Sequence, residues 1–285
     1  MSGRVSSAGR GSERLSARRR KKRRRAFYAF IIVIVLALCA CVWGLQQPVV
    51  RISQVKIFGP SSLGSSGEAS ADQSLSAVVF SAMQGTYLGI IPCDSTFFFP
   101  EARIRADILV AYPDIAAISI FRNGLAGLSI KIDNRIPIAR WCGSSPDATS
   151  TACYLFDTKG FIFATTGPAT GEASATVPMN SFILYESLSG EPVGSTLPNA
   201  TRFPPVFNFA RQLYTFGSPV SSIVIRADEV DDYLTSGSRI TYVLGNEQNT
   251  FTALVSARDS FNLADGSIQY IDLRFDRKMY VKKKE

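Results

Sequence analysis

Near its start, this chain has eight consecutive basic residues that run directly into twenty uncharged, mostly apolar residues. The basic run is Arg18, Arg19, Arg20, Lys21, Lys22, Arg23, Arg24 and Arg25, and residues 26–45 read AFYAFIIVIVLALCACVWGL. A helix rises about 1.5 Å per residue, so this segment is long enough to cross the roughly 30 Å hydrocarbon core of a bilayer. The sequence therefore predicts a disordered basic tail over 1–25 and a transmembrane helix over 26–45.

The distribution of basic residues also predicts the orientation of the helix. The next basic residues after the apolar segment are only Arg51 and Lys56. Basic residues are enriched on the cytoplasmic side, so we expect a cytoplasmic N-terminus and an extracytoplasmic body in a single-pass protein of the cell membrane. Tyr28 and Trp43 lie near the two ends of the segment, where aromatic rings favour the membrane interface.

Two other N-terminal signals remain open at this point. A cleaved secretory signal has an apolar core of roughly 7–15 residues, which is shorter than this run. Residues 38–41 (LCAC) resemble a bacterial lipoprotein box, in which Cys41 would be acylated after cleavage. Either alternative would still place the rest of the chain outside, and intact-mass measurement would distinguish them from an uncleaved anchor.

The net charge of +8 comes from the tail and does not describe the body. Residues 1–25 hold eleven of the 31 Lys and Arg and one of the 23 Asp and Glu, which leaves twenty basic and twenty-two acidic residues in the remainder. A nearly neutral body is not a nucleic-acid-binding surface, so we expect protein partners and no nucleic acid.

The composition offers little catalytic chemistry. The sequence contains no histidine, which removes the commonest general base and the commonest zinc ligand. A Ser–Lys dyad using Lys56 or Lys131 is formally open, but neither lysine has a serine context that marks a nucleophile. We expect no enzyme activity, no cofactor, no metal and no small-molecule substrate.

Three cysteines follow the membrane segment, in a compartment that permits disulfides. Cys142 and Cys153 bracket the polar loop GSSPDATSTA between two strand-like runs. If these strands pair, the two cysteines face each other at the base of the loop, so we predict a disulfide there. Cys93 is then left over, and we expect it to be a buried thiol.

Residues 49–141 predict a first domain with the order β-α-α-β-β. Residues 50–59 form a strand pattern that ends at Gly59. Apolar residues then recur at helical spacing from Leu75 to Met83, and a second helix follows Pro100 and ends before Pro113. Residues 115–122 and 128–133 are the last two strands, the latter alternating between apolar and polar residues.

Residues 142–282 predict a second, mostly antiparallel β domain with one or two helices. Residues 153–165 form a hairpin pattern around Gly160. Three further strands are expected at 182–188, 221–226 and 239–245. One helix opens at Pro204 and is closed by Gly217, and a shorter one covers Leu254. The fold class is therefore α+β.

The most regular pattern in the chain is the alternation over residues 270–282. Its apolar positions share one parity, and they are Ile271, Leu273, Phe275, Met279 and Val281. Period-two alternation of this length predicts one terminal strand with one packed and one wet face. Such a strand either completes its own sheet or offers a free edge to a strand from a partner.

The order of these motifs resembles the FtsQ/DivIB family of bacterial cell-division proteins over nearly the whole chain. The matching segments are residues 52–59 (ISQVKIFG), 112–115 (YPDI), 118–132, 135–141 (RIPIARW), 156–161 and 270–275 (YIDLRF). Asn134 stands where the family usually has Glu, and the loop after Gly59 is long.

The resemblance implies a divisome scaffold at the division septum. Residues 49–141 would be a POTRA domain that contacts other division membrane proteins, and residues 142–282 a β domain that binds FtsB-like and FtsL-like proteins. Strand addition would occur at the terminal strand, where the contact residues would be Arg274, Phe275, Asp276, Lys278 and Tyr280. The alternative is another membrane-anchored POTRA-type interaction protein in envelope assembly or export.

Overall fold

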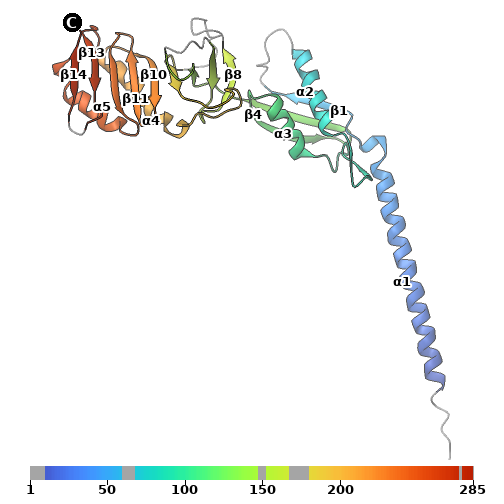
Figure 1. The fold of residues 1–285 in the computed structure, drawn as a ribbon. Coiled ribbons are helices and arrows are strands. Elements are labelled where there is room, and N and C mark those ends of the chain that lie inside the picture. Colours follow the sequence, from blue (N-terminus) through green and yellow to red (C-terminus); the bar gives the residue numbers. More distant parts are fainter. Residues whose placement is uncertain (1–9, 60–67, 147–151, 167–179, 276–277, 285) are drawn as a thin grey trace, which may run out of the picture. The chain divides into compact units, whose positions relative to one another are not determined.

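The computed structural model describes residues 10–59, 68–146, 152–166, 180–275 and 278–284. The chain has mixed α+β structure, with one apolar N-terminal helix and a body that is mostly sheet (Figure 1). It divides into two compact units. The first contains residues 1–108 and 118–132, and the second contains residues 109–117 and 133–285.

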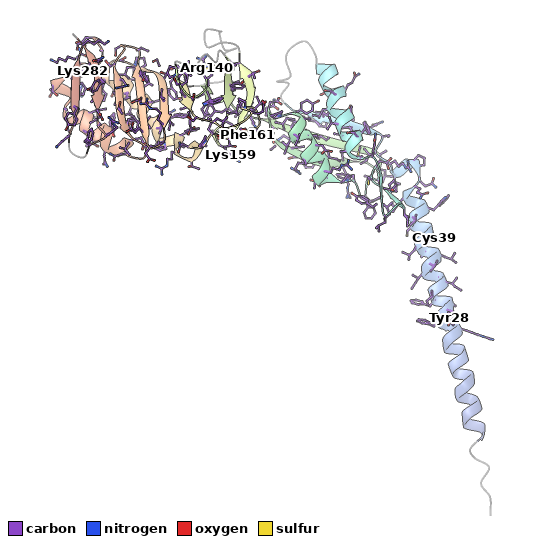
Figure 2. The ribbon with its side chains drawn as sticks, in the orientation of Figure 1. Tyr28, Cys39, Arg140, Lys159, Phe161 and Lys282 are labelled. Carbon is purple, nitrogen blue, oxygen red and sulfur yellow. A yellow bond between two sulfur atoms is a disulfide. The ribbon has the colours of Figure 1, made fainter. Side chains whose placement is uncertain are left out.

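Helix α1 (Arg10–Leu45) contains the apolar segment. Its part Arg25–Leu45 has a mean hydropathy of 2.7 and is long and apolar enough to cross a membrane. Tyr28 and Cys39 project outward from this part (Figure 2). Helix α1 also includes residues 10–25, which the sequence analysis assigns to the tail. Arg, Lys and Ala are good helix formers, and a helix already formed extends without a new nucleus.

The first unit contains a three-stranded sheet and two helices. Its elements are η1 (Pro48–Val50), β1 (Gln54–Phe58), α2 (Glu68–Ala82), β2 (Thr86–Tyr87), β3 (Ile91–Pro92), α3 (Glu101–Ala111), β4 (Ile115–Asn123) and β5 (Gly127–Asn134). The end of α3, the start of β4 and the last two residues of β5 are grouped with the second unit. The sheet order is β1-β5-β4, with β1 parallel to β5. The predicted apolar faces are buried, as at Leu75 and Val79 in α2 and at Ile104 and Ile108 in α3. The small β2–β3 hairpin was not predicted.

The second unit is built on a nine-stranded sheet. Its elements are β6 (Ala139–Trp141), β7 (Cys153–Phe156), β8 (Ile162–Thr166), β9 (Ile183–Glu186), η2 (Ala200–Arg202), α4 (Phe203–Leu213), η3 (Tyr214–Phe216), β10 (Val220–Arg226), β11 (Glu229–Leu234), β12 (Arg239–Val243), α5 (Glu247–Ser256), η4 (Arg258–Ser260), β13 (Ile268–Asp272) and β14 (Tyr280–Lys283). The strand order is β14-β13-β12-β11-β10-β9-β6-β7-β8. Because β6 belongs to this sheet, the second unit begins before residue 142, where we expected the boundary.

Helix α4 forms the centre of the second core. It starts with Pro204 and Pro205, whose fixed φ suits the first turn, and Gly217 follows η3 in a left-handed conformation with a φ of 90°. Six of its side chains are buried, namely Phe203, Val206, Phe207, Phe209, Ala210 and Leu213. They pack in one hydrophobic cluster with residues of the sheet and with Leu254 of α5. Helix α4 contacts β10, and α5 contacts β12.

The terminal strand does not run through residues 270–282 as predicted. It is two short strands, β13 and β14, that pair antiparallel. The alternation could not reveal this turn, because the register joins Ile271 to Val281 and Asp272 to Tyr280. Each pair joins residues of equal parity, so a hairpin with this register preserves the same alternation as a straight strand.

Candidate functional site

The C-terminal hairpin forms one end of the nine-stranded sheet. Strand β14 pairs with β13 on one side and is the terminal strand of the sheet order (Figure 1). All four of its residues are exposed. The edge of the sheet is therefore formed by β14 alone, whereas the sequence predicts one strand over residues 270–282 in that place. Two of the residues that form it, Val281 and Lys283, were not among the predicted contacts.

The backbone groups of β14 face alternately toward β13 and toward solvent. The amide of Lys284 donates to the carbonyl of Ser267, with 2.8 Å between N and O. Alternate residues of an antiparallel strand face the same neighbour, so Lys282 and Tyr280 also direct their amides toward β13. It follows that the amides and carbonyls of Val281 and Lys283 point away from the sheet.

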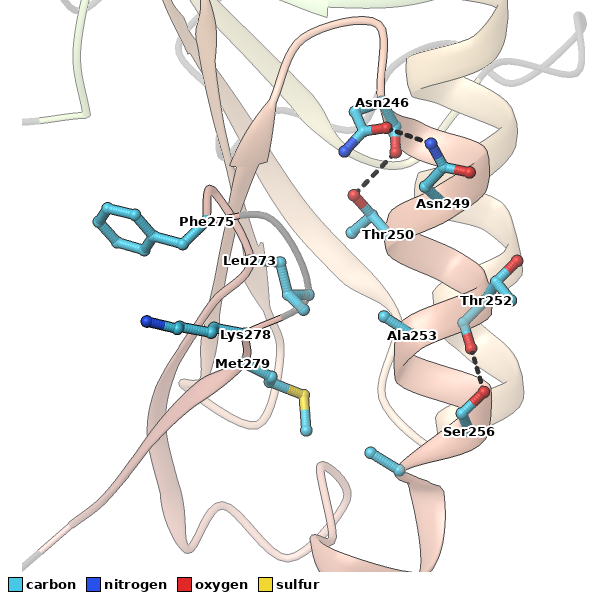
Figure 3. Close-up of a pocket in the computed structure, with 11 residues that line it drawn as sticks. Asn246, Asn249, Thr250, Thr252, Ala253, Ser256, Leu273, Phe275, Lys278 and Met279 are labelled. Atoms are coloured by element: carbon cyan, nitrogen blue, oxygen red, sulfur yellow. Dashed lines mark hydrogen bonds between the residues drawn. The ribbon is translucent and has the colours of Figure 1, made fainter.

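A groove of about 480 Å³ lies between α5 and the hairpin. Its floor and walls come from residues of both elements, including Asn249, Ala253, Ser256, Leu273 and Met279. Figure 3 shows Leu273 and Met279 pointing toward α5 from the hairpin side. On the opposite wall, Thr252 and Ser256 bond to each other along the helix, with 2.9 Å between the Ser256 hydroxyl and the Thr252 carbonyl. The groove thus combines an apolar wall with a polar one.

Arg274 follows β13 in the hairpin and forms ion pairs with Asp272 and Glu229. Its guanidinium donates to both oxygens of Asp272, at 3.0 Å from Nε to Oδ1 and 2.7 Å from Nη2 to Oδ2. Its Nη1 lies 2.7 Å from Oε1 of Glu229, at the start of β11. The side-chain hydrogen bonds from Arg274 lower the pKa of Asp272 below its usual range. Arg274 therefore holds the end of β13 to β11.

The other predicted contact residues lie on the surface of the hairpin. Phe275 is 52% exposed and points away from α5 (Figure 3). Its ring meets that of Tyr280 edge to face, with 5.5 Å between centroids. Lys278 is also exposed. Asp276 lies outside the described residues.

The charge along this edge is positive. Lys278, Lys282 and Lys283 are exposed, and Lys282 projects from the end of the sheet (Figure 2). Lysines on an edge strand discourage pairing between identical edges, because the like charges repel each other. They also favour an incoming strand that carries acidic side chains.

The remaining predicted residues lie far from this edge in the sequence. Cys142 and Cys153 form a disulfide bond at the entrance of β7, and Cys93 is a buried free thiol. The basic run Arg18–Arg25 lies within α1, where the side chain of Arg25 is exposed. Lys56 and Lys131 lie on β1 and β5. Within the described ranges, no group of three or more His, Cys, Asp or Glu residues is placed to hold a metal ion.

Comparison with known proteins gives no further identification. No family model matches this sequence, and no curated protein matches it either.

Proposed function

We propose that this chain is a membrane-anchored, non-enzymatic scaffold of the FtsQ/DivIB type that binds FtsB-like and FtsL-like division proteins at the septum. The observation that carries the proposal is the free, exposed backbone edge of β14 at the end of the nine-stranded sheet. An incoming strand gains its affinity there from main-chain hydrogen bonds and its register from alternate side chains.

Two features of the N-terminal half support this assignment. The first unit has the order β1-α2-β2-β3-α3-β4-β5, and its three-stranded sheet has the order β1-β5-β4. Apart from the small β2–β3 hairpin, this is the β-α-α-β-β order of the POTRA domain that the resemblance implies. The basic run before Arg25–Leu45 favours a cytoplasmic N-terminus and an extracytoplasmic body. This location and orientation suit a protein that links early and late division proteins through contacts outside the cytoplasm.

The edge and the groove suggest how a partner would bind. The outward amides and carbonyls of Val281 and Lys283 would pair with the backbone of an acidic strand. Apolar side chains beside that strand would cover Leu273 and Met279 in the groove. Phe275 would add exposed aromatic surface next to the same strand, whereas Arg274 would act by holding the hairpin in place.

A proline at the edge tests this mode of binding. Val281→Pro removes an amide that faces away from β13, so the β13–β14 ladder should survive, as proline is tolerated on the solvent side of edge strands. Val281→Ala is the matched control, because it shortens the side chain and keeps the amide. We expect the full-length Val281→Pro protein to lose at least tenfold in co-purified FtsB-like partner while Val281→Ala retains it. Equal recovery with both variants would refute strand addition at β14.

The cellular role has its own test. Depletion in the native cell should give filaments, and a fluorescently tagged chain should form a mid-cell band that depends on α1. Normal division with diffuse envelope fluorescence would refute the septal role and would favour an anchored interaction protein of envelope assembly or export.

A further inference from the structure

The chain that leaves α1 is bound at once to two loops of the first unit. Val50 is five residues beyond Leu45, and its carbonyl accepts a hydrogen bond from the Thr96 amide at 3.0 Å. The Ile52 amide donates to the Asp94 carbonyl at 2.8 Å, and the Ser53 amide donates to the Ala126 carbonyl at 2.9 Å. Residues 94–96 and 126 are therefore fixed to the first residues after the membrane helix.

The β2–β3 hairpin belongs to the same end of the unit. Strand β3 contacts α1, and the Cys93 amide closes the hairpin by donating to the Gly85 carbonyl at 3.1 Å. At its tip, Leu88 is 94% exposed and has a left-handed φ of 52°. A left-handed conformation costs a leucine about 1–2 kcal/mol. A side chain that stays in water contributes no hydrophobic stabilisation to offset this cost. In a turn that faces only solvent, Gly or Asn would be expected at this position.

Other large apolar side chains at this end are exposed as well. Together with Leu88 they form what we call the apolar tip: Val49, Leu88, Ile90, Phe97, Phe98 and Leu125. Leu125 is tied to the same loop, because its carbonyl accepts a hydrogen bond from the Thr96 hydroxyl. Two arginines lie beside these side chains. Arg122 donates to the Phe97 carbonyl at 3.4 Å, and Arg51, which is 44% exposed, lies 3.7 Å from the Asp94 carboxylate.

The length of the intervening chain limits how far this tip can be from the bilayer. Five residues extend at most about 18 Å, and the polar headgroup layer on each side of the hydrocarbon core is about 5–8 Å thick. The segment after Leu45 includes the short η1 turn (Pro48–Val50), so its span is smaller than that limit. Loops bonded to Val50, Ile52 and Ser53 are thus within reach of the headgroup layer.

We propose that the apolar tip inserts into the outer-leaflet interface of the same membrane that α1 crosses. Exposed Leu, Ile and Phe side chains flanked by arginine are the composition that binds at this depth, with apolar groups below the headgroups and guanidinium groups at the phosphates. The insertion would fix how the first unit stands on the membrane. The proposal rests on α1 being a membrane anchor and is independent of the division role.

Depth-dependent fluorescence quenching tests the insertion. The full-length chain is reconstituted in vesicles of phosphatidylethanolamine and phosphatidylglycerol, with or without bromine on the acyl chains. Trp43→Phe removes the tryptophan of the membrane segment, and the buried Trp141 supplies a constant background. A single probe is then added as Leu88→Trp or Phe98→Trp. The matched control is Phe58→Trp. Phe58 is an exposed aromatic residue at the far end of β1, about 13 Å from Gln54 at its start.

Insertion predicts that brominated lipid quenches Leu88→Trp and Phe98→Trp at least twofold more than Phe58→Trp, with a blue-shifted emission. Quenching of either tip probe no greater than that of Phe58→Trp would overturn the proposal and would leave the tip as a surface for a protein partner. Flotation of the vesicles separates this outcome from a failure of α1 to anchor, because an unanchored chain would not float. A failure of partner binding at β14 would change neither the quenching nor the flotation, so the two proposals can fail independently.

Discussion

Arg274 and Glu229 form an ion pair between the chain that follows β13 and the start of β11, with 2.7 Å between Nη1 and Oε1. The two residues are 45 positions apart in the sequence. The same guanidinium also holds the Asp272 carboxylate. Arginine suits this position because its planar fork can bond one carboxylate with two N–H groups while a third reaches another.

We expect Arg274→Ala to lower the free energy of unfolding by about 1 kcal/mol at neutral pH, the upper range for partly exposed ion pairs. The loss should shrink as the pH falls below about 4, because the lowered pKa of Asp272 contributes stability only where that carboxyl is ionised. Denaturant unfolding of the full-length protein in detergent measures both effects. The control is Arg258→Ala, which removes an exposed arginine in η4. An equal loss of unfolding free energy in both variants would contradict a stabilising role for the ion pairs of Arg274.

Phe275→Ala should affect binding more than stability. Half of its surface is exposed and its main described ring contact is Tyr280, so we expect less than about 1 kcal/mol of lost stability. Aromatic side chains often dominate interfaces, so co-purification of the FtsB-like partner should fall by about tenfold. Tyr214→Ala removes an exposed aromatic ring outside the site and should change neither quantity. Undiminished binding by a folded Phe275→Ala protein would exclude this ring from the contact.

Removing the Cys142–Cys153 disulfide should destabilise the second unit by about 3 kcal/mol, the entropic value for a loop of this length. The double variant Cys142→Ala/Cys153→Ala isolates this effect, and reductant should no longer lower its melting temperature. Cys93→Ala leaves the bridge intact and should keep the response to reductant. Alkylation of the denatured, unreduced protein should label Cys39, Cys41 and Cys93 alone.

Stability should decline as the pH rises from about 5 to 8. Burial raises the pKa of Asp232 well above its usual range, and the charges of Asp231 and Glu247 raise it further. An acid with a raised pKa binds a proton in the folded state that the unfolded state has released, so folding weakens with pH by up to about 1.4 kcal/mol per unit. Burial raises the pKa of Glu186 in the same direction.

Asp232→Asn should remove most of this slope and stabilise the protein at pH 8 relative to the wild type. Glu186→Gln should remove a smaller part of it. Thermal unfolding of the three proteins across this pH range makes the comparison. A wild-type stability that rises with pH over this range would contradict a raised pKa for Asp232 in the folded protein.

Much of the secondary structure could be predicted because its apolar periodicity is local. The faces of α2 and α3, the helix that starts at Pro204 and the hairpin around Gly160 follow from patterns within single segments. Strand β11 was missed because its sequence EVDDYL places Asp231 and Asp232 at buried positions, where a strand pattern expects apolar residues. For Asp231 this burial is compensated by tertiary partners, the Thr241 hydroxyl and the Arg226 guanidinium, which a pattern within one segment does not reveal.

The structure changes the geometry that the sequence predicts for the candidate site, because residues 270–282 form a hairpin and not one strand. Alternation within residues 270–282 indicates which side chains share a face, yet a hairpin with an even register gives the same alternation. Arg274 was predicted as a contact, and its partner Glu229 could not be inferred because it is distant in the sequence. The groove beside α5 could not be predicted from the sequence either, because it depends on how a helix and a turn from separate segments pack.

The pairing of β14 on one side only has a mechanical consequence. If the proposed scaffold role is right, a partner bound at β14 would pull on this strand against the membrane anchor. A load applied through β14 would act on a four-residue strand held by a single ladder, whereas the interior strands are each held by two. The hairpin would therefore peel away before the core opened, so that excessive tension would release the partner and leave the rest of the fold able to bind again.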